Sequence, residues 1–407
     1  MRLPGTIGSS APVPGWPAAE WRGDQLGIRC VFMRGGTSRG AILRAEDMPA
    51  DPILLEKVVL AIYGSPDVRQ VDGLGGAHPL TSKVGIVGAC IHGCADVDFK
   101  FGQVRINEAH VDFSGSCGNL SAAIGPYAID AGLVHPHEPT TDVRIHAVNN
   151  NTTLTARVPV RAGFATVEGD EAIAGVPGTG GRVLLEYGSA ADTLGKGLLP
   201  TGRARESLTI SEGEVEVSII DVANPVVFIN ARSLGLTGTE LPPEFNIVML
   251  DRFERLRAQA AHRLGLVPRP SQAAAISPAI PKVYLVSSPA SYRDSTGERV
   301  QSDDVDVVAR GFSMGLPHQA YAGTVALCTA GAAQIPGTVV NEVARPLAAS
   351  HFRIGHPSGT LTVEVSVKFE NGSPRIERAA MVRTARRIME GTVYIPASRV
   401  LEPVAPF

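Results

Sequence analysis

The residue whose surroundings point most directly to chemistry is Cys117. It follows a short run with strand character, residues 111–113, that Ser114 and Gly115 interrupt. A stretch of small apolar residues comes next, and Gly132 can end the helix it predicts. We therefore expect the thiol in the first turn of a helix. Free N–H groups and the positive dipole end there lower a thiol's pKa and can bind a carboxylate. The alternative is a small buried hydrophobe, as most free cysteines are.

Composition limits the classes of function. The chain has 407 residues, 44% of them apolar, enough for two or three domains with sizeable cores. Its formal net charge is −3 and no basic run occurs, which argues against nucleic acid and anionic membranes as partners. No apolar run is long enough to span a bilayer. The uneven spread of five cysteines favours a reduced, cytoplasmic protein; they are Cys30, Cys90, Cys94, Cys117 and Cys328.

The two halves of the chain resemble each other. Three segments of the first half recur in the same order in the second half, at offsets of 186, 199 and 198 residues. Such spacing indicates one duplicated domain with small insertions. The matched pairs are 41–48 with 227–234, 81–87 with 280–286, and the helix near Cys117 with 313–333, where Gly125 matches Gly323.

Residue patterns predict an α+β fold. Short β-branched runs dominate each half, and Asp51 can cap an amphipathic helix over 51–63, with a longer counterpart over 242–264. Two further helices, 117–131 and 316–333, are apolar on nearly all sides and should be buried. We expect each half to form a curved, mostly antiparallel sheet around one such central helix. The two helix N-termini would then face each other across a cleft between the halves, a usual place for a ligand site.

Many short motifs resemble the PrpF family, and together they run from about residue 28 to residue 396. The resemblance implies the diaminopimelate-epimerase-like fold, with two pseudosymmetric domains and the active site between them. It implies an isomerase of unsaturated polycarboxylates, such as 2-methylaconitate, 4-oxalomesaconate or methylitaconate, without metal, flavin or pyridoxal phosphate. It also implies two catalytic residues, Lys83 and Cys117. The motifs lie at 32–40, 64–67, 70–77, 81–83, 96–104, 114–119, 313–318, 335–338 and 355–360.

Domain limits follow from the repeat and the resemblance. We expect an N-terminal tail over 1–27, a first epimerase-like domain over 28–205, a second over 206–396 whose end can pack back on the first, and a tail over 397–407.

The chemistry of an allylic isomerisation supports the same pair of residues. A proton must leave a carbon next to an unsaturated acid, and a carbon must be protonated again. A lysine desolvated in a cleft and a thiol at a helix N-terminus can both do this near neutral pH. An ordinary surface lysine is the alternative for Lys83, but its place at the head of an apolar strand favours an inward-facing amine. Which of the two groups removes the proton stays open.

The second half of the chain lacks a cysteine at the expected start of its central helix. Two-cysteine epimerases of this fold need a thiol at the start of both central helices. Here Cys117 aligns with Gly315, and Cys328 lies three turns farther along, where a core position is expected. An asymmetric lysine and cysteine pair is therefore favoured over symmetric two-thiol racemisation.

Further residues are expected to bind the substrate. A Gly-rich turn before residue 41 can bring backbone close to a carboxylate, although it could equally be a hairpin turn. Polar residues near the two catalytic groups, at the start of the second helix and in a late loop would supply the other contacts. The expected binding residues are Gly36, Thr37, Ser38, Ser82, Ser116, Gly118, Asn119, Asn224, Ser313, Met314, His318, His356, Ser358 and Gly359.

Other readings of the sequence stay open. His318 or His356 could serve Cys117 as a base, which would make the protein a cysteine-dependent acyl-transferase or hydrolase. A non-catalytic binding protein would leave Lys83 and Cys117 unexplained. The segment 90–94 holds two cysteines and His92 but no evident fourth ligand, so we expect no metal. The identity of the acid cannot be determined from the chain, and a homodimer is the default expectation.

Overall fold

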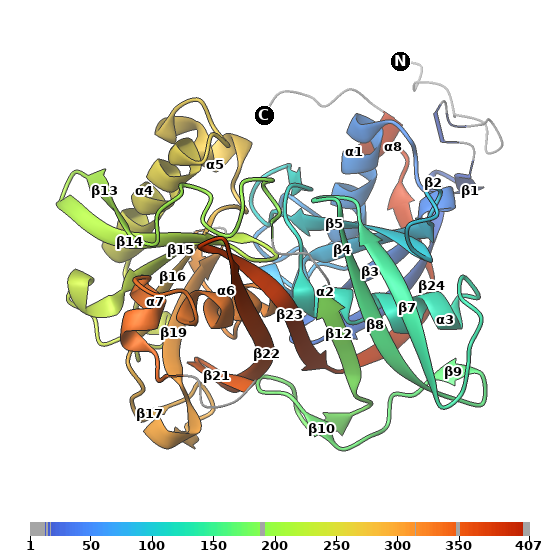
Figure 1. Ribbon diagram of the computed structural model, residues 1–407. Helices are drawn as coiled ribbons and strands as arrows, with labels where there is room; N and C mark the ends of the chain where they lie inside the picture. The colour runs from blue at the N-terminus through green and yellow to red at the C-terminus, as the bar shows by residue number, and fades with distance from the viewer. Residues whose placement is uncertain are drawn as a thin grey trace, which may run out of the picture.

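The computed structural model describes residues 13, 15–16, 18–187, 192–313, 315–346 and 351–401. Figure 1 shows two lobes of strands and few helices, the first half of the chain forming mainly the right lobe and the second half mainly the left. One 20-stranded sheet system runs through both lobes, and most neighbouring strands in it are antiparallel. The expected α+β class with curved, mostly antiparallel sheets is thus present.

The first lobe is built around four strands that position Lys83. The hairpin of β2 (Gln25–Gly35) and β3 (Ser38–Arg44) lies next to β4 (Lys83–Ala89), which runs parallel to β3. The strand β5 (Val97–Val104) continues the sheet antiparallel to β4. Both faces of these strands are covered, since two separate apolar clusters pack against them. This explains why β4 is almost continuously apolar.

The second lobe repeats this arrangement. Antiparallel β14 (Gly213–Asp221) and β15 (Pro225–Asn230) precede β16 (Lys282–Ser287), which runs parallel to β15. The strand β19 (Val307–Ser313) follows antiparallel to β16, in the place that β5 has in the first lobe. The duplication predicted from the sequence is therefore a duplication of strand order and direction.

Two amphipathic helices end close to where the sequence predicts. The helix α1 (Pro52–Tyr63) is capped by the Asp51 carboxylate, which accepts from the Leu54 N–H at 2.7 Å, and Gly64 ends it in a left-handed conformation. The helix α4 (Ile247–Arg263) is shorter than expected, because Asn246 caps it and residues 242–244 form a separate 3₁₀ turn.

The central helix of the first half is divided, contrary to expectation. Residues 117–131 form α2 (Gly118–Ser121) and α3 (Ile124–Asp130), with a turn between them. Pro126 lies in the first turn of α3, where its missing N–H is tolerated, but it cannot continue a helix from α2. The break leaves a short α2 whose N-terminus is at Cys117.

The central helix of the second half begins later than predicted. The helix α6 spans Gly323–Ala333, whereas Leu316–Pro317 forms β20, paired with the end of β19 through a turn at Gly315. Proline at position 317 suits an edge strand better than a helix interior. The counterpart of Cys117 at the helix start is therefore Ala322 rather than Gly315.

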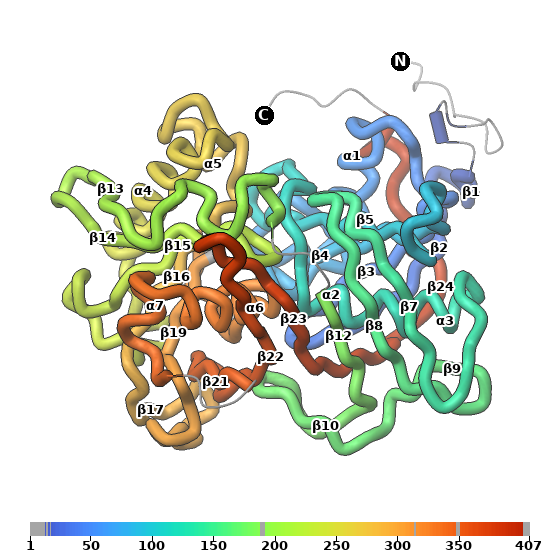
Figure 2. Tube along the Cα trace, viewed as in Figure 1, coloured from blue at the N-terminus to red at the C-terminus, as the bar shows by residue number. Residues whose placement is uncertain are grey.

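Late strands return to the first lobe. The strand β22 (Gly359–Glu370) pairs with β23 (Ser373–Arg383), which also pairs with β12 (Val183–Tyr187). The strand β24 (Ala385–Pro396) then lies antiparallel to β2 over its whole length, and Figure 2 shows this red segment within the lobe of the first half. The end of the chain thus packs back on the first lobe, while the boundary at residue 205 stays a prediction.

The described parts of the two expected tails pack against the first lobe. Trp16 is fully buried, and its indole N–H donates to the Asp47 carbonyl at 2.7 Å. Residues 20–22 form β1, paired with the start of β2, and 398–401 form α8. Both segments cover apolar surface that would otherwise face water.

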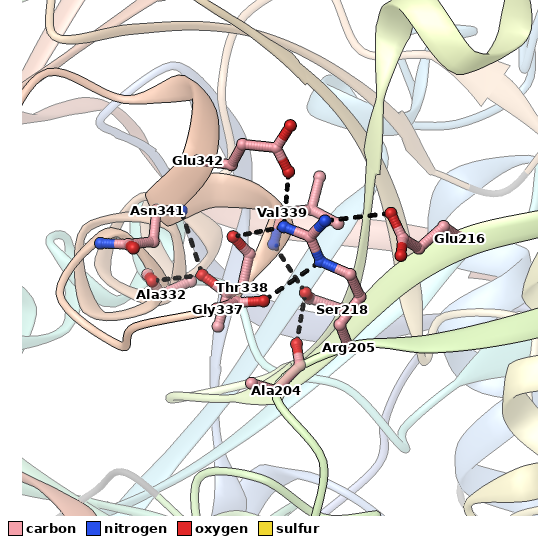
Figure 3. A network of polar contacts seen from close by, with 10 residues as sticks. All are labelled: Ala204, Arg205, Glu216, Ser218, Ala332, Gly337, Thr338, Val339, Asn341 and Glu342. Carbon is pink, nitrogen blue, oxygen red and sulfur yellow. Dashed lines mark hydrogen bonds and ion pairs between the residues drawn. The ribbon is translucent and has the colours of Figure 1, made fainter.

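A polar network holds α6 and α7 (Val339–Val343) against β14 and the segment that precedes β13 (Glu206–Ile210), as Figure 3 shows. The Arg205 guanidinium bonds the Gly337 and Thr338 carbonyls and pairs with Glu216 and Glu342. The network acts at the C-terminal end of α6. It therefore fixes the helix that carries Gly323 at its other end.

The remaining strands and helices connect the two lobes or lie at their edges. None of the helices in the described residues is both long and apolar enough to cross a membrane. The remaining strands are β6 (Val111–Asp112), β7 (Thr140–Ala147), β8 (Thr152–Arg161), β9 (Phe164–Ala165), β10 (Glu171–Ala172), β11 (Thr179–Gly180), β17 (Tyr292–Arg293), β18 (Arg299–Val300) and β21 (His351–His356), and α5 spans Ala273–Ile276.

Candidate active site

A small cavity of about 30 Å³ lies where the two halves meet, and it contains both expected catalytic residues. Its walls come from β3, β4, β5 and the start of α2 in the first half, and from β16, the segment after β20 and the start of α6 in the second. The lining residues are Ser38, Leu80, Lys83, Phe101, Gln103, Gly115, Ser116, Cys117, Gly118, Asn119, Ala279, Lys282, Tyr284, His318, Ala322, Gly323 and Thr324.

Lys83 is the first residue of β4 and is only 8% exposed. Its Nζ donates to Gln103 Oε1 at 2.5 Å and lies 5.3 Å from the centre of the Phe101 ring. The Tyr63 hydroxyl, at the end of α1, donates to the Lys83 carbonyl and so fixes the start of the strand. Burial lowers the pKa of Lys83, while the neighbouring Cys117 partly offsets this effect. The shift makes the neutral amine more accessible than it is in an exposed lysine.

Cys117 is the N-cap residue of α2, as the sequence predicts. Its Sγ accepts from the Leu120 N–H at 3.4 Å, and its carbonyl accepts from the Ser121 N–H at 2.9 Å. The thiol also lies 4.0 Å from the Ser38 hydroxyl. A sulfur in the N-cap position is held next to backbone N–H donors. The geometry thus suits a thiol that gives and takes a proton.

The starts of α2 and α6 meet at this cavity. A Cβ atom on Gly118 would lie 2.9 Å from the backbone N of Thr324, so the absence of a side chain permits the close approach. Backbone donors from both halves consequently border one small space. Among the described residues that line it, none is an aspartate or a glutamate. The cavity therefore combines cationic and N–H groups and favours an anionic ligand.

Polar side chains join the two halves beside the thiol. The Asn224 amide donates to Thr324 Oγ1 at 2.7 Å and to Ser116 Oγ at 3.1 Å. Ser116 Oγ is also 3.3 Å from the Ala223 carbonyl, to which it can donate. Asn224 itself does not line the cavity, so its part is to hold Ser116 and Thr324 in place.

His318 enters the cavity from the second half, although it belongs to the segment after β20 rather than to α6. Its Nδ1 accepts from the Ala320 N–H at 3.1 Å. Burial and the nearby lysines lower the pKa of His318 to about 3, so the ring is neutral. The proton must then be on Nε2, which can donate one hydrogen bond to a ligand.

A second, larger cavity of about 270 Å³ adjoins the first, with Asn119 shared between them. Thr37 and His356 line this second cavity rather than the first. The Arg383 guanidinium also lines it and donates to Asn119 Oδ1 at 2.9 Å, and burial lowers the pKa of Arg383 to about 10. The arginine is therefore still charged at neutral pH.

The other predicted binding residues that the structure describes are not among the lining residues of the first cavity. Gly36 packs against the Asn119 amide. Ser358 donates to the Gln319 carbonyl, and the next residue, Gly359, begins β22. Ser82 is fully buried and donates to Gln70 Oε1 at 2.7 Å, which makes it a support for the chain before Lys83. Ser313 ends β19 rather than starting a helix, and Met314 lies outside the described residues.

Gln103 and Lys282 are among the cavity residues that the sequence-based prediction did not include. Gln103 accepts from the Lys83 amine, and its own amide donates to the Ser82 carbonyl at 3.0 Å. Gln103 belongs to the motif 96–104, but the motif does not show its contact with Lys83, because the pairing of β4 with β5 brings the two residues together. Lys282 was detectable, since the internal repeat matches residues 81–83 with 280–282.

The other cysteines behave differently from Cys117. Cys328 is completely buried in α6, and burial raises its pKa, which confirms a core position. Cys90 and Cys94 lie in a loop with their sulfurs 3.5 Å apart, and the nearby histidine is His146 rather than His92. The His146 ring already bonds Asp98 and Asn151 through its two nitrogens.

The fold and the position of the cavity define the structural class to which the chain belongs. Two lobes of repeated strand order, with short helices directed at a shared cavity, form an epimerase-like fold. Solved structures of a hydroxyproline epimerase and a proline racemase share it, at TM-scores of 0.55 and 0.53 and only 13% and 12% identity.

Comparison of sequences defines the family. The family model described as "PrpF protein" matches residues 25–396, and the chain belongs to this family. It is 46% identical to 3-methylitaconate isomerase of Eubacterium barkeri, over 93% of this chain and 100% of that protein. It is 39% identical to 2-methyl-aconitate isomerase of Shewanella oneidensis, over 91% and 98%. The solved structure of a methylitaconate-delta-isomerase superposes with a TM-score of 0.76 at 45% identity, covering 94% of this chain and 99% of that one.

Proposed function

We propose that this protein is an isomerase of unsaturated di- and tricarboxylates in which Lys83 and Cys117 move the proton. The observation that carries the proposal is their convergence on one cavity that has no carboxylate among its described lining residues. The amine is buried and the thiol caps a helix, so each is suited to act as acid or base. The relatives named above are isomerases of such acids.

The reaction requires two proton transfers. One group takes a proton from the carbon next to the double bond, and the electron pair of that C–H bond forms a new C=C bond. The old π electrons move toward the carboxylate, giving a dienolate. The second group then donates a proton to the other end of the conjugated system, so the step is redox-neutral. Gln103 holds the lysine amine and Ser38 borders the thiol, which keeps both groups directed at the ligand.

Charge develops on the substrate during this step, and the cavity can offset it. Residues at the starts of α2 and α6 line the same space, so their backbone N–H groups can serve as donors to a ligand there. The Nε2–H of neutral His318 can donate there too. Donors fixed before the reaction stabilise a dienolate without reorganising.

The substrate within this class is proposed from chemistry and similarity together. We favour 2-methylaconitate as the substrate, with 3-methylitaconate and 4-oxalomesaconate as the alternatives. All three acids are candidates because each contains an allylic C–H next to a carboxylate-bearing double bond. A cytoplasmic location also belongs to the proposal, since the described cysteines are all free thiols.

Solvent deuterium exchange tests the proposal. Each of the three acids is incubated with the enzyme in D₂O, and mass spectrometry follows both exchange and isomer formation. Lys83→Met and Cys117→Ser should each lower isomer formation by about 10²-fold or more. Lys100→Met and Cys94→Ser, which alter a lysine and a cysteine outside the cavity, are the matched controls. Wild-type rates in both cavity variants, on an acid that the wild type converts, would refute the roles.

The acyl-transfer alternative has weaker support. It needs a base bonded to Cys117, but the contacts of its sulfur among the described residues are Leu120 N and Ser38 Oγ. The His318 Nδ1 is occupied, and His356 lines the adjoining cavity. Trapping of a thioester by hydroxylamine would nevertheless favour that alternative over isomerisation.

A further inference from the structure

Lys282 has the same structural position in the second lobe as Lys83 has in the first. Each lysine is the first residue of a strand that runs parallel to the preceding strand of its lobe. Gly40 of β3 lies opposite Lys83, and Val226 of β15 lies opposite Lys282. The duplication therefore places two lysines on the walls of one cavity.

The surroundings of Lys282 differ from those of its counterpart. Its Nζ donates to the Ala279 carbonyl at 3.2 Å, and the Ala279 N–H in turn donates to Asp112 Oδ2 at 3.0 Å. Asp112 belongs to the first half, and its other oxygen accepts from Ser114. No ion pair joins Lys282 to any carboxylate in the part of the chain that the structure describes.

The Lys282 amine is charged, and no aspartate or glutamate is among the described residues that line its cavity. Burial and the charge of Lys83 lower the pKa of Lys282 to about 8, while Cys117 and Asp112 act in the opposite direction. At pH 7 most of the lysine is therefore protonated. A half-buried cation without a paired anion is costly, and an anionic ligand would compensate it.

We propose that Lys282 binds a substrate carboxylate and thereby selects polycarboxylates, while Lys83 and Cys117 act on the proton. The division follows from the contacts: the Lys83 amine is held by a side-chain oxygen of Gln103, whereas Lys282 has only one backbone carbonyl. A lysine of this kind anchors the end of the substrate that does not react. The inference rests on the proposed isomerase function and adds a residue that fixes the ligand.

Binding of mesaconate, an unsaturated dicarboxylate with an allylic methyl group, tests this role. Titration calorimetry compares wild type with Lys282→Met and Lys282→Gln, and with Lys100→Met as the matched control. We expect Kd to rise by about tenfold or more in both Lys282 variants, since a charge-assisted hydrogen bond is lost. The control should bind as the wild type does. Thermal unfolding of every variant checks that the fold is kept.

Exchange of the mesaconate methyl protons with D₂O provides the second readout. The Lys282 variants should need more mesaconate for half-maximal exchange, with a smaller change in the rate at saturation. Unchanged Kd in both folded variants would overturn the role of Lys282. Weakened binding without exchange in the wild type would instead keep the anchor and refute mesaconate isomerisation.

Discussion

The two halves of the molecule present the same framework with different chemistry at equivalent places. Each has a parallel strand pair, a lysine at the head of the second strand and a helix that starts at the shared cavity. In the first half the helix is capped by a thiol, whereas Ala322 has no capping side chain in the second. The lysines differ too, since Gln103 holds Lys83 and a backbone carbonyl holds Lys282.

This difference indicates how a duplicated fold becomes asymmetric. A symmetric pair of thiols would suit inversion at a stereocentre, where a proton leaves one face and arrives at the other. Here one half supplies the proton-handling groups, and the other supplies donors and a cation. Such a division suits a reaction in which the double bond moves while the carboxylates stay fixed.

The largest expected effect comes from moving the thiol between the halves. The double variant Cys117→Ala/Ala322→Cys places a cysteine at the equivalent helix start of the second lobe. We expect activity about 10²-fold or more below wild type, because Lys282 lacks the support that Gln103 gives Lys83. Isomer formation measures this. Recovery to near wild-type rates would show that the halves are interchangeable.

A smaller loss is expected from Gly118→Ala. The new Cβ would lie 2.8 Å from Met381 Cε and 2.9 Å from the Thr324 backbone N, so the two helix starts must separate. Misplacing the donors by such a shift should lower kcat by about tenfold to 10²-fold. Gly331→Ala in α6 is the control, since its Cβ has ordinary contacts of 3.4 Å. Equal kcat for both variants would contradict the importance of this contact.

The pH dependence of binding should distinguish the two lysines. Because the pKa of Lys282 is lowered to about 8, its charge is present below that pH and is lost as pH rises through it. Mesaconate binding should therefore weaken above about pH 8 in the wild type. In Lys83→Met the weakening should occur at a higher pH, because the charge that helps to lower the pKa of Lys282 is removed. In Lys282→Met this weakening of binding with rising pH should be absent. The groups that face Lys282 are Lys83, Cys117, Asp112, Arg257 and His318. Persistence of the pH dependence in Lys282→Met would show that Lys282 is not its source.

The smallest effect on catalysis is expected at the other cysteine of the central helices. Cys328→Ala removes a fully buried sulfur from the core and should lower the free energy of unfolding by about 1 kcal/mol. Activity should stay at the wild-type level. Urea unfolding and turnover measure the two quantities, and a loss of turnover without destabilisation would show that the thiol reacts.

Local sequence determined what depends on near neighbours in the chain. Asp51 and Gly64 delimit α1, and the break before Cys117 places its sulfur at a helix start, because caps and turns involve residues a few positions apart. The repeat between 81–87 and 280–286 also matches the structure, since a parallel strand pair in each lobe depends on the same apolar pattern.

Only the tertiary structure decided which side chains share the cavity. Gln103 reaches Lys83 through strand pairing, and Thr324 reaches Gly118 through contact between helices about 200 residues apart. His356 carries a sequence signal as strong as that of His318, yet it lies at the adjoining cavity. A local pattern gives the type and position of an element. Which cavity a side chain enters depends on strand register. It also depends on the turn at Gly315 and on β20, because these place the start of α6 at Gly323.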